Sequence, residues 1–195
     1  MSLPRGGLYP SRHLAGEASF QTQRVPKETG AGDASLIYVG DAVRLVSGKA
    51  IRYLSTDVSS SIAPPVFGVV GRVLVDEKGR PRVHGLPDQH PNISLTAQAD
   101  FLDVYTDPHL VFAGRIAGSA TNELINSVLN VATTARVTAA GISGTMLNAT
   151  PVSGDRGPFV VVGVSDFDLN GGGSDAAGRV EVIMNFNAFK VPADT

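Results

Sequence analysis

The sequence predicts a mainly β protein: an antiparallel β-barrel or sandwich body with one short helix and an extended N-terminal arm. The first indication is the low share of charged residues, 17% of 195 residues, because the exposed faces of helical bundles need many Glu and Lys side chains. The second is the excess of valine over leucine, since β-branched residues favour strands. The third is the abundance of glycine and proline, 22 and 12 residues, which is typical of frequent turns.

Composition also excludes several classes of function. The net charge is −2, so the chain has no global positive field and we expect no direct contact with nucleic acid. Because the chain has no cysteine, disulfides, thiolate metal sites and cysteine nucleophiles are excluded. No apolar run approaches the roughly 18 residues of a membrane-spanning helix, and no secretory signal is visible. We therefore expect no membrane partner.

Residues 1–35 differ from the rest of the chain. Prolines and glycines interrupt this segment, and no strand or helix periodicity runs through it. It is either a disordered leader or an extended arm that orders against a partner. The second interpretation accounts for its spaced apolar residues, which would be interaction anchors: Leu8, Tyr9, Leu14 and Phe20. We expect this arm to matter more for assembly than for folding.

Residues 36–80 predict a small β-barrel-like part. Short strand-like runs follow one another here, separated by turn signals such as Gly40-Asp41. The longest run, residues 66–75, contains Gly68 and Gly71 within a β-branched sequence. Glycines at such positions predict a bulge or a tight bend, as in a small barrel.

Residues 81–195 predict a β-rich part with one helix, either separate from the first part or continuous with it. Two apolar runs, 101–106 and 110–116, flank the turn signal Asp107-Pro108-His109 and together predict a hairpin. The helix is predicted at residues 121–132, where Thr121 can serve as the N-cap and apolar residues recur at helical spacing.

Two further strands are predicted near the end of the chain. The continuous apolar run 159–164 indicates a strand buried on both faces. Residues 179–189 alternate, with Val180, Val182 and Met184 on one face and Asn185 on the opposite one.

The motif search indicates no catalytic residue and no cofactor. The four histidines are His13, His84, His90 and His109; none has a metal-binding or protease spacing, and three lie in turns or beside prolines. Ser143 and Ser165 lie near glycines but lack the Gly-x-Ser-x-Gly pattern of a serine nucleophile.

One stretch suggests a metal ion. Residues 166–171 begin like a calcium-binding loop, but the position that needs a bidentate Glu is Ala177. A looser cation site would use Asp166, Asp168 and Asp175. The alternative is a turn in which Asp and Asn side chains bond their own backbone, and we predict no metal site.

Several segments carry a family resemblance. The segment Tyr38-Val39-Gly40-Asp41-Ala42-Val43-Arg44-Leu45 and the later Pro65-Val66-Phe67-Gly68-Val69-Val70-Gly71-Arg72-Val73 resemble the small β-barrel of tailed-bacteriophage capsid decoration (cement) and head structural proteins. The C-terminal end of phage virion proteins is similar to three further stretches of this chain: Thr145-Met146-Leu147-Asn148, Phe159-Val160-Val161-Val162-Gly163-Val164 and Ala177-Gly178-Arg179-Val180-Glu181-Val182-Ile183-Met184-Asn185.

The resemblance implies a non-enzymatic virion structural protein that binds and stabilises the outside of an icosahedral capsid. The implied partners are the major capsid protein and the chain itself, as a homotrimer, and the implied location is the virion after synthesis in the host cytoplasm. Two alternatives remain. One is another phage structural component: a shell subunit, a head fibre or a tail piece. The other is a β-fold hydrolase with a dispersed Asp/His site.

Overall fold

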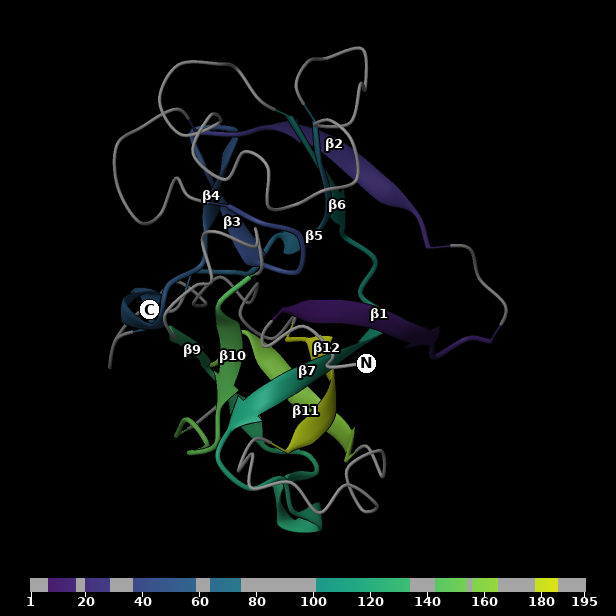
Figure 1. Ribbon diagram of the computed structural model, residues 1–195, viewed down its shortest axis with the longest axis vertical. Coiled ribbons are helices and arrows are strands. Elements are labelled where there is room, and N and C mark those ends of the chain that lie inside the picture. Colours follow the sequence, from purple (N-terminus) through teal and green to yellow (C-terminus); the bar gives the residue numbers. More distant parts are fainter. Residues whose placement is uncertain are drawn as a thin grey trace, which may run out of the picture.

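The computed structural model describes residues 7–16, 20–28, 37–58, 64–74, 101–133, 143–153, 156–164 and 178–185. Two β-sheets follow one another along the long axis of the molecule (Figure 1). The strands are β1 (Leu8–His13), β2 (Thr22–Pro26), β3 (Ala42–Val46), β4 (Lys49–Arg52), β5 (Gly68–Leu74), β6 (Phe101–Tyr105), β7 (Leu110–Ala117), β8 (Val128–Leu129), β9 (Val131–Thr133), β10 (Thr145–Asn148), β11 (Phe159–Val164) and β12 (Arg179–Met184). The mainly β fold class predicted from composition is confirmed.

The first sheet is a nearly closed barrel. Its five strands lie in the order β2-β6-β5-β3-β4, with antiparallel neighbours. A parallel bridge between Lys27 and Ala50 brings the end of β2 next to β4, the other edge strand. The inward-facing side chains form one small core: Val25, Ile37, Val43, Ala50, Val70, Leu102 and Val104.

The glycines of β5 produce the predicted bulge. The register between β5 and β6 shifts between Val70 and Arg72, which leaves Gly71 as the extra residue. A Cβ atom on Gly71 would lie 2.7 Å from the Tyr105 ring, and one on Gly68 would collide with the Tyr105 carbonyl oxygen. Tyr105 can therefore pack across β5 only because both positions lack a side chain.

The second sheet has seven strands, centred on β7. Its order is β8-β11-β12-β7-β10-β9, and β1 also pairs with β7. All pairs are antiparallel except β10 with β7. One edge of β7 thus bonds β12, while the opposite edge bonds first β1 and then β10. The large core under this sheet includes Phe112, Ile116, Leu129, Leu147, Phe159, Val180, Val182 and Met184.

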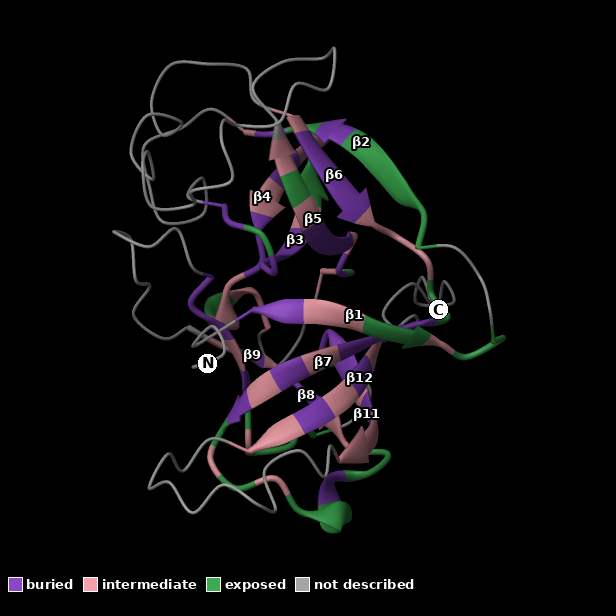
Figure 2. Cartoon of the chain, turned by 45° about the vertical axis from the view of Figure 1, so that its right-hand side comes forward, coloured by how far each residue is buried: buried purple, intermediate pink, exposed green. Residues whose placement is uncertain are grey.

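The described part of residues 1–35 is extended and belongs to the body. β1 lies along the side of the second sheet that faces the barrel, and β2 is an edge strand of the barrel (Figure 1). Leu8 is 1% exposed, and its side chain occupies the space above Gly114, where any Cβ atom would collide with it. From this buried start β1 becomes exposed towards its end (Figure 2). The described strands of this segment are therefore part of the two sheets, and its greater weight in assembly than in folding stays a prediction.

The two sheets do not divide the chain at residue 80, in line with the alternative that the two predicted parts are continuous. The strand β6 lies after residue 80 in sequence but pairs with β2 and β5 in the barrel. The predicted hairpin of 101–106 with 110–116 is wrong, because β6 and β7 belong to different sheets. The turn at Asp107-Pro108-His109 exists, with Leu110 N–H bonded to the Asp107 carbonyl at 3.3 Å. It carries the chain from one sheet to the other instead of returning it alongside β6.

The predicted helix at 121–132 is also wrong. Only Asn122–Leu124 forms a single 3-10 turn, η3, and Asn126 adopts a left-handed conformation with φ of 68°. The residues that follow form β8 and β9, which pair with β11 and β10. Leu124 and Leu129 of the expected apolar face are buried, whereas Ile125 is 40% exposed. The Leu124 N–H donates to the Thr121 carbonyl within the 3-10 turn, and Leu129 pairs with Phe159 of β11 instead of continuing a helix.

The alternation predicted near the C-terminal end is confirmed where the structure describes it. Val180, Val182 and Met184 are buried on one face of β12. Asn185 is 2% exposed and donates a hydrogen bond to the Gly157 carbonyl at 2.8 Å, so its predicted outward position is wrong. On β11 the second face is only half-buried. Within the described residues, no helix is long and apolar enough to cross a membrane.

Candidate functional site

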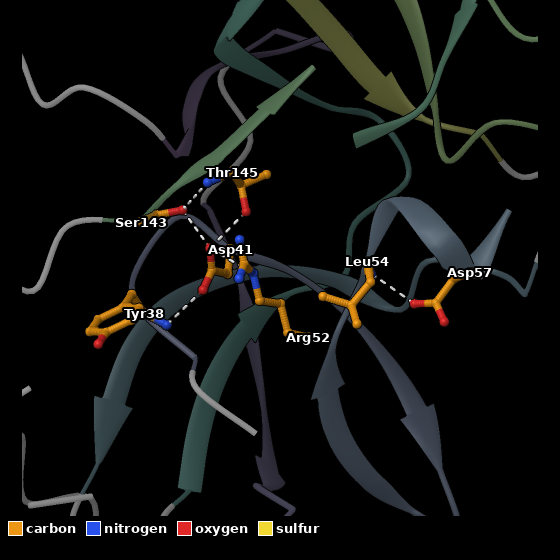
Figure 3. A network of polar contacts seen from close by, with 7 residues as sticks. All are labelled: Tyr38, Asp41, Arg52, Leu54, Asp57, Ser143 and Thr145. Carbon is orange, nitrogen blue, oxygen red and sulfur yellow. Dashed lines mark hydrogen bonds and ion pairs between the residues drawn. The ribbon is translucent and has the colours of Figure 1, made fainter. Parts of the chain in front are cut away.

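A buried polar cluster lies where the two sheets meet, and we call it the junction cluster: Tyr38, Asp41, Arg52, Ser143 and Thr145 (Figure 3). Arg52 comes from β4 and Asp41 immediately precedes β3, so both belong to the barrel. Ser143 and Thr145 lie at the start of β10 in the second sheet. The cluster therefore connects residues about a hundred positions apart in the sequence.

The Asp41 carboxylate is the centre of this cluster. One oxygen, Oδ1, accepts hydrogen bonds from the hydroxyls of Ser143 and Thr145, the latter at 2.7 Å. The other, Oδ2, accepts the Tyr38 backbone N–H at 2.9 Å. The Arg52 Nε atom lies 3.6 Å from Oδ1, and both side chains are buried. A buried charge is tolerated when its lone pairs are satisfied in this way.

The N-terminal strand reaches the same junction through its backbone. Gly7 N–H donates to the Thr145 carbonyl of the second sheet, and Leu8 N–H donates to the Gly40 carbonyl of the barrel, both at 2.8 Å. Gly40 has φ of +88°, and a Cβ atom there would lie 2.9 Å from the Gly7 Cα. Only glycine allows this close approach of two segments of the chain.

The junction cluster joins the two sheets through buried hydrogen bonds. The Ser143 hydroxyl donates to Asp41 and accepts the Thr145 N–H at 3.0 Å, so its proton and one of its lone pairs are already used. In a buried position this arrangement holds the start of β10 against the barrel and does not present a nucleophile to solvent.

Two of the four histidines do come together in space. His13 Nε2 lies 2.9 Å from Asp107 Oδ2, and the His13 and His109 ring centres are 6.0 Å apart. His13 Nδ1 accepts the Ala15 N–H at 3.0 Å, so in neutral His13 the proton is on Nε2 and is donated to Asp107. The cluster joins the end of β1 to the connection between β6 and β7.

The electrostatics of this histidine cluster centre on its carboxylate. The hydrogen bond from the His109 backbone N–H, at 2.8 Å, lowers the pKa of Asp107, and the bond from His13 acts in the same direction. Since both ring nitrogens of His13 are engaged, neither is available to take a proton from a substrate or a nucleophile. We therefore interpret the histidine cluster as a structural contact that fixes the end of β1 to the connection between β6 and β7.

A third polar group spans the barrel. Asp103 on β6 is nearly buried and faces an arginine on each neighbouring strand. Arg24 Nε on β2 donates to Asp103 Oδ1 at 3.0 Å, and a terminal nitrogen of Arg72 on β5 lies 3.2 Å from Oδ2. Such cross-strand ion pairs stabilise the strand order.

The residues singled out from sequence have different positions. Of the four anchors, Leu8 is part of the core and Tyr9 is half-buried, where burial raises the pKa of its hydroxyl and the nearby Asp41 carboxylate adds to the effect. Leu14 and Phe20 are exposed by 46% and 45%. The metal candidates Asp166, Asp168 and Asp175, with His84 and His90, lie outside the described residues. Within those residues, no group of three or more His, Asp or Glu side chains could hold a metal ion.

Sequence reasoning missed the junction cluster. Gly40-Asp41 reads as an ordinary turn signal, and a buried carboxylate has no local signature. Ser143 lies near glycines but lacks the Gly-x-Ser-x-Gly pattern, so its sequence context gives it no role. The one usable signal was the charged Arg52 between the apolar residues Ile51 and Tyr53.

Comparison with known proteins adds no assignment, because no family model, curated protein or solved structure matches this chain.

Proposed function

We propose that this chain is a non-enzymatic structural protein of a tailed-phage virion, which binds and stabilises the outside of the icosahedral capsid as a decoration protein. Its partners are the major capsid protein and further copies of itself, in a homotrimer. It is made in the host cytoplasm and functions in the virion.

The observation that carries this proposal is the exposure of two large apolar side chains on the connection between β1 and β2. Leu14 and Phe20 are each nearly half exposed, although they lie only a few residues from buried strand residues. Covering such side chains with a partner removes apolar surface from water and is favourable by about 25 cal/mol per Å². These are two of the four anchors that the sequence indicated.

The neighbouring structure holds these anchors in place. On one side, Leu14 N–H donates to the His109 carbonyl at 2.9 Å, and the His13–Asp107 bond fixes the end of β1. On the other side, β2 pairs along its whole length with β6. The backbone of Leu14 is fixed before binding, and this lowers the entropy lost when its side chain contacts a partner.

The motif residues behind the resemblance support the same proposal. Val43 and Val70, from the two barrel motifs, face the barrel core, and Gly71 forms the bulge of β5. The motif thus accounts for a small barrel in this chain, and the family resemblance supplies the assembly role.

Binding to undecorated capsid shells tests the proposal directly. Purified protein should co-sediment with shells at a fixed stoichiometry and raise the shell melting temperature. Absence of both effects would overturn the proposal. Light scattering on the free protein tests the homotrimer separately.

Two variants test which surface is used. Leu14→Ser combined with Phe20→Ser should weaken shell binding by about tenfold or more, since two apolar anchors are lost. Ile125→Ser is the matched control, because Ile125 is exposed by 40% on a different part of the molecule, and its shell affinity should be unchanged. Equal shell affinity of the double variant and the control would show that Leu14 and Phe20 are not part of the contact with the shell.

The alternatives give different results. Tubes or closed shells formed by the protein alone, seen by electron microscopy, would indicate a shell subunit. Turnover in a panel of hydrolase substrates that is lost in His109→Ala would indicate a hydrolase, since His109 is the exposed histidine beside Asp107.

A further inference from the structure

The turn after β1 uses a histidine ring as a hydrogen-bond acceptor. β1 ends at His13, and residues 14–16 form the turn that follows. His13 Nδ1 accepts the Ala15 N–H at 3.0 Å, and the His13 carbonyl accepts the Gly16 N–H at 3.2 Å. Asp and Asn side chains often accept the backbone N–H two residues further on in this way. Here the acceptor is an imidazole, which can bind a further proton.

The other ring nitrogen of His13 faces a carboxylate. Nε2 lies 2.9 Å from Asp107 Oδ2, and the His13 side chain is only 7% exposed. Because Nδ1 is an acceptor, the single proton of the neutral ring is on Nε2 and is donated to Asp107. Both nitrogens of the neutral ring therefore have a partner of the matching kind.

A second proton on this ring is compatible with only one of the two contacts. It binds at Nδ1 and turns the acceptor of the Ala15 N–H into a donor, so that two N–H groups face each other across 3.0 Å. At the same time the charged ring is held more strongly by Asp107, because a charge-assisted hydrogen bond is roughly twice as strong as a neutral one. Protonation therefore breaks the bond to Ala15 and strengthens the bond to Asp107.

The charged groups around the ring act on the other contact. Asp107, in the connection between β6 and β7, faces Nε2. His109 in the same connection has its ring centre 6.0 Å from that of His13, and its side chain is 64% exposed. On β1 itself, Arg12 pairs with Glu181 of β12 at 2.9 Å. The contact that the structure shows at Nδ1 is the Ala15 N–H.

We propose that His13 is a pH-sensitive switch, which opens the turn of residues 14–16 when its ring becomes protonated. The opening begins at Ala15, because the Leu14 N–H donates to the His109 carbonyl at 2.9 Å and this bond does not involve a titrating group. The end of β1 stays attached through Asp107. The inference concerns the free protein and is independent of the proposed capsid role.

NMR on the full chain tests the switch between pH 8 and 5, the range in which histidine changes its charge. The ¹⁵N signal of His13 Nδ1 should report an unprotonated nitrogen at pH 8 and a protonated one at pH 5. Over the same range the protection of the Ala15 amide against hydrogen exchange, corrected for the intrinsic exchange rate at each pH, should fall by about tenfold. The Leu14 amide is the internal control, and its protection should stay unchanged.

Two histidine variants separate the switch from a general effect of pH. His13→Asn keeps an acceptor for the Ala15 N–H but does not titrate, so Ala15 should be equally protected at pH 8 and 5. His109→Asn removes the exposed histidine of the cluster and should lose Ala15 protection as the wild type does. A neutral His13 ring at pH 5, a protonated ring with unchanged Ala15 protection, or an equal loss in His13→Asn would overturn the proposal.

Discussion

The barrel and the second sheet bury different kinds of side chains. The barrel core is small and consists mainly of valines with one alanine, one isoleucine and one leucine. The second sheet buries aromatic and long aliphatic side chains, among them Phe112, Phe159, Leu147 and Met184. Four residues of the barrel part are buried in this larger core and not in their own: Ala42, Tyr53, Val66 and Val69.

This difference indicates that the barrel depends on the second sheet for part of its stability. A small barrel exposes much of its surface and buries little apolar area by itself. Here the end of the barrel that faces the second sheet is covered by the larger core, by the junction cluster and by the start of β1. We therefore expect the two sheets to unfold together.

The largest effect should come from breaking the junction. Asp41→Asn removes the carboxylate charge that faces the buried Arg52 guanidinium, and the loss of one partner of a buried ion pair costs about 3–5 kcal/mol. Thr145→Val is the milder control and removes one hydroxyl donor, for about 1 kcal/mol. Urea denaturation measures both. A loss below 1 kcal/mol in Asp41→Asn would show that the junction does not hold the sheets together.

A second pair of variants compares the two cores directly. Phe112→Ala in the second sheet should lower the free energy of unfolding by about 3–5 kcal/mol, because a large cavity remains. Val104→Ala in the barrel should cost roughly 1–2 kcal/mol, since two methyl groups are lost. Thermal unfolding of Phe112→Ala followed in both sheets by hydrogen exchange should show one transition. A barrel that keeps its protection in this variant would contradict the dependence on the second sheet.

Within the N-terminal segment, two leucines distinguish folding from assembly. Leu8→Ala should cost about 2–5 kcal/mol, because Leu8 is fully buried over Gly114. Leu14→Ala should change stability by less than about 0.5 kcal/mol, as expected for an exposed position. Similar melting temperatures for Leu8→Ala and Leu14→Ala would show that the N-terminal segment does not contribute to the stability of the fold.

The smallest effect concerns the pH dependence of stability that Asp107 of the histidine cluster causes. Because hydrogen bonds lower the pKa of Asp107 in the folded protein, its carboxylate contributes stability above its usual pKa of about 4. This contribution is lost as the pH falls through the lowered value. Asp107→Asn should therefore be less stable than the wild type at pH 7, and this gap should shrink as the pH falls below about 4. Equal melting temperatures of Asp107→Asn and the wild type at pH 7 would show that Asp107 does not stabilise the attachment of β1.

Much of the local structure could be predicted from sequence. The alternation of Val180, Val182 and Met184 identified the buried face of β12, and Gly71 within a β-branched run indicated the bulge of β5. These features depend on side-chain period and on backbone freedom, both of which are local properties. The candidate site was different, because Asp41 had the same sequence context as any turn residue.

Two of the wrong predictions, the helix and the hairpin, have a common physical cause. The spacing of Leu124, Val128 and Leu129 fits a helical face. In the structure Leu124 lies in the 3-10 turn η3, and Val128 and Leu129 form the short strand β8, whose partner is β11. Likewise, Asp107-Pro108-His109 is a genuine turn, and only the positions of the two sheets decide that β6 and β7 separate there. Local propensity cannot choose between such alternatives, because the hydrogen bonds that decide come from distant strands.

By itself, the sequence determined that this chain is built from short strands and turns, and where most of the strands lie. Tertiary structure alone decided which strands pair, that Leu8 belongs to the core, and that Asp41 meets Ser143 and Thr145. The reason is one of distance along the chain: Asp41 and its two hydroxyl donors are separated by 102 and 104 residues. Their contact depends on how the two sheets pack and not on any local pattern.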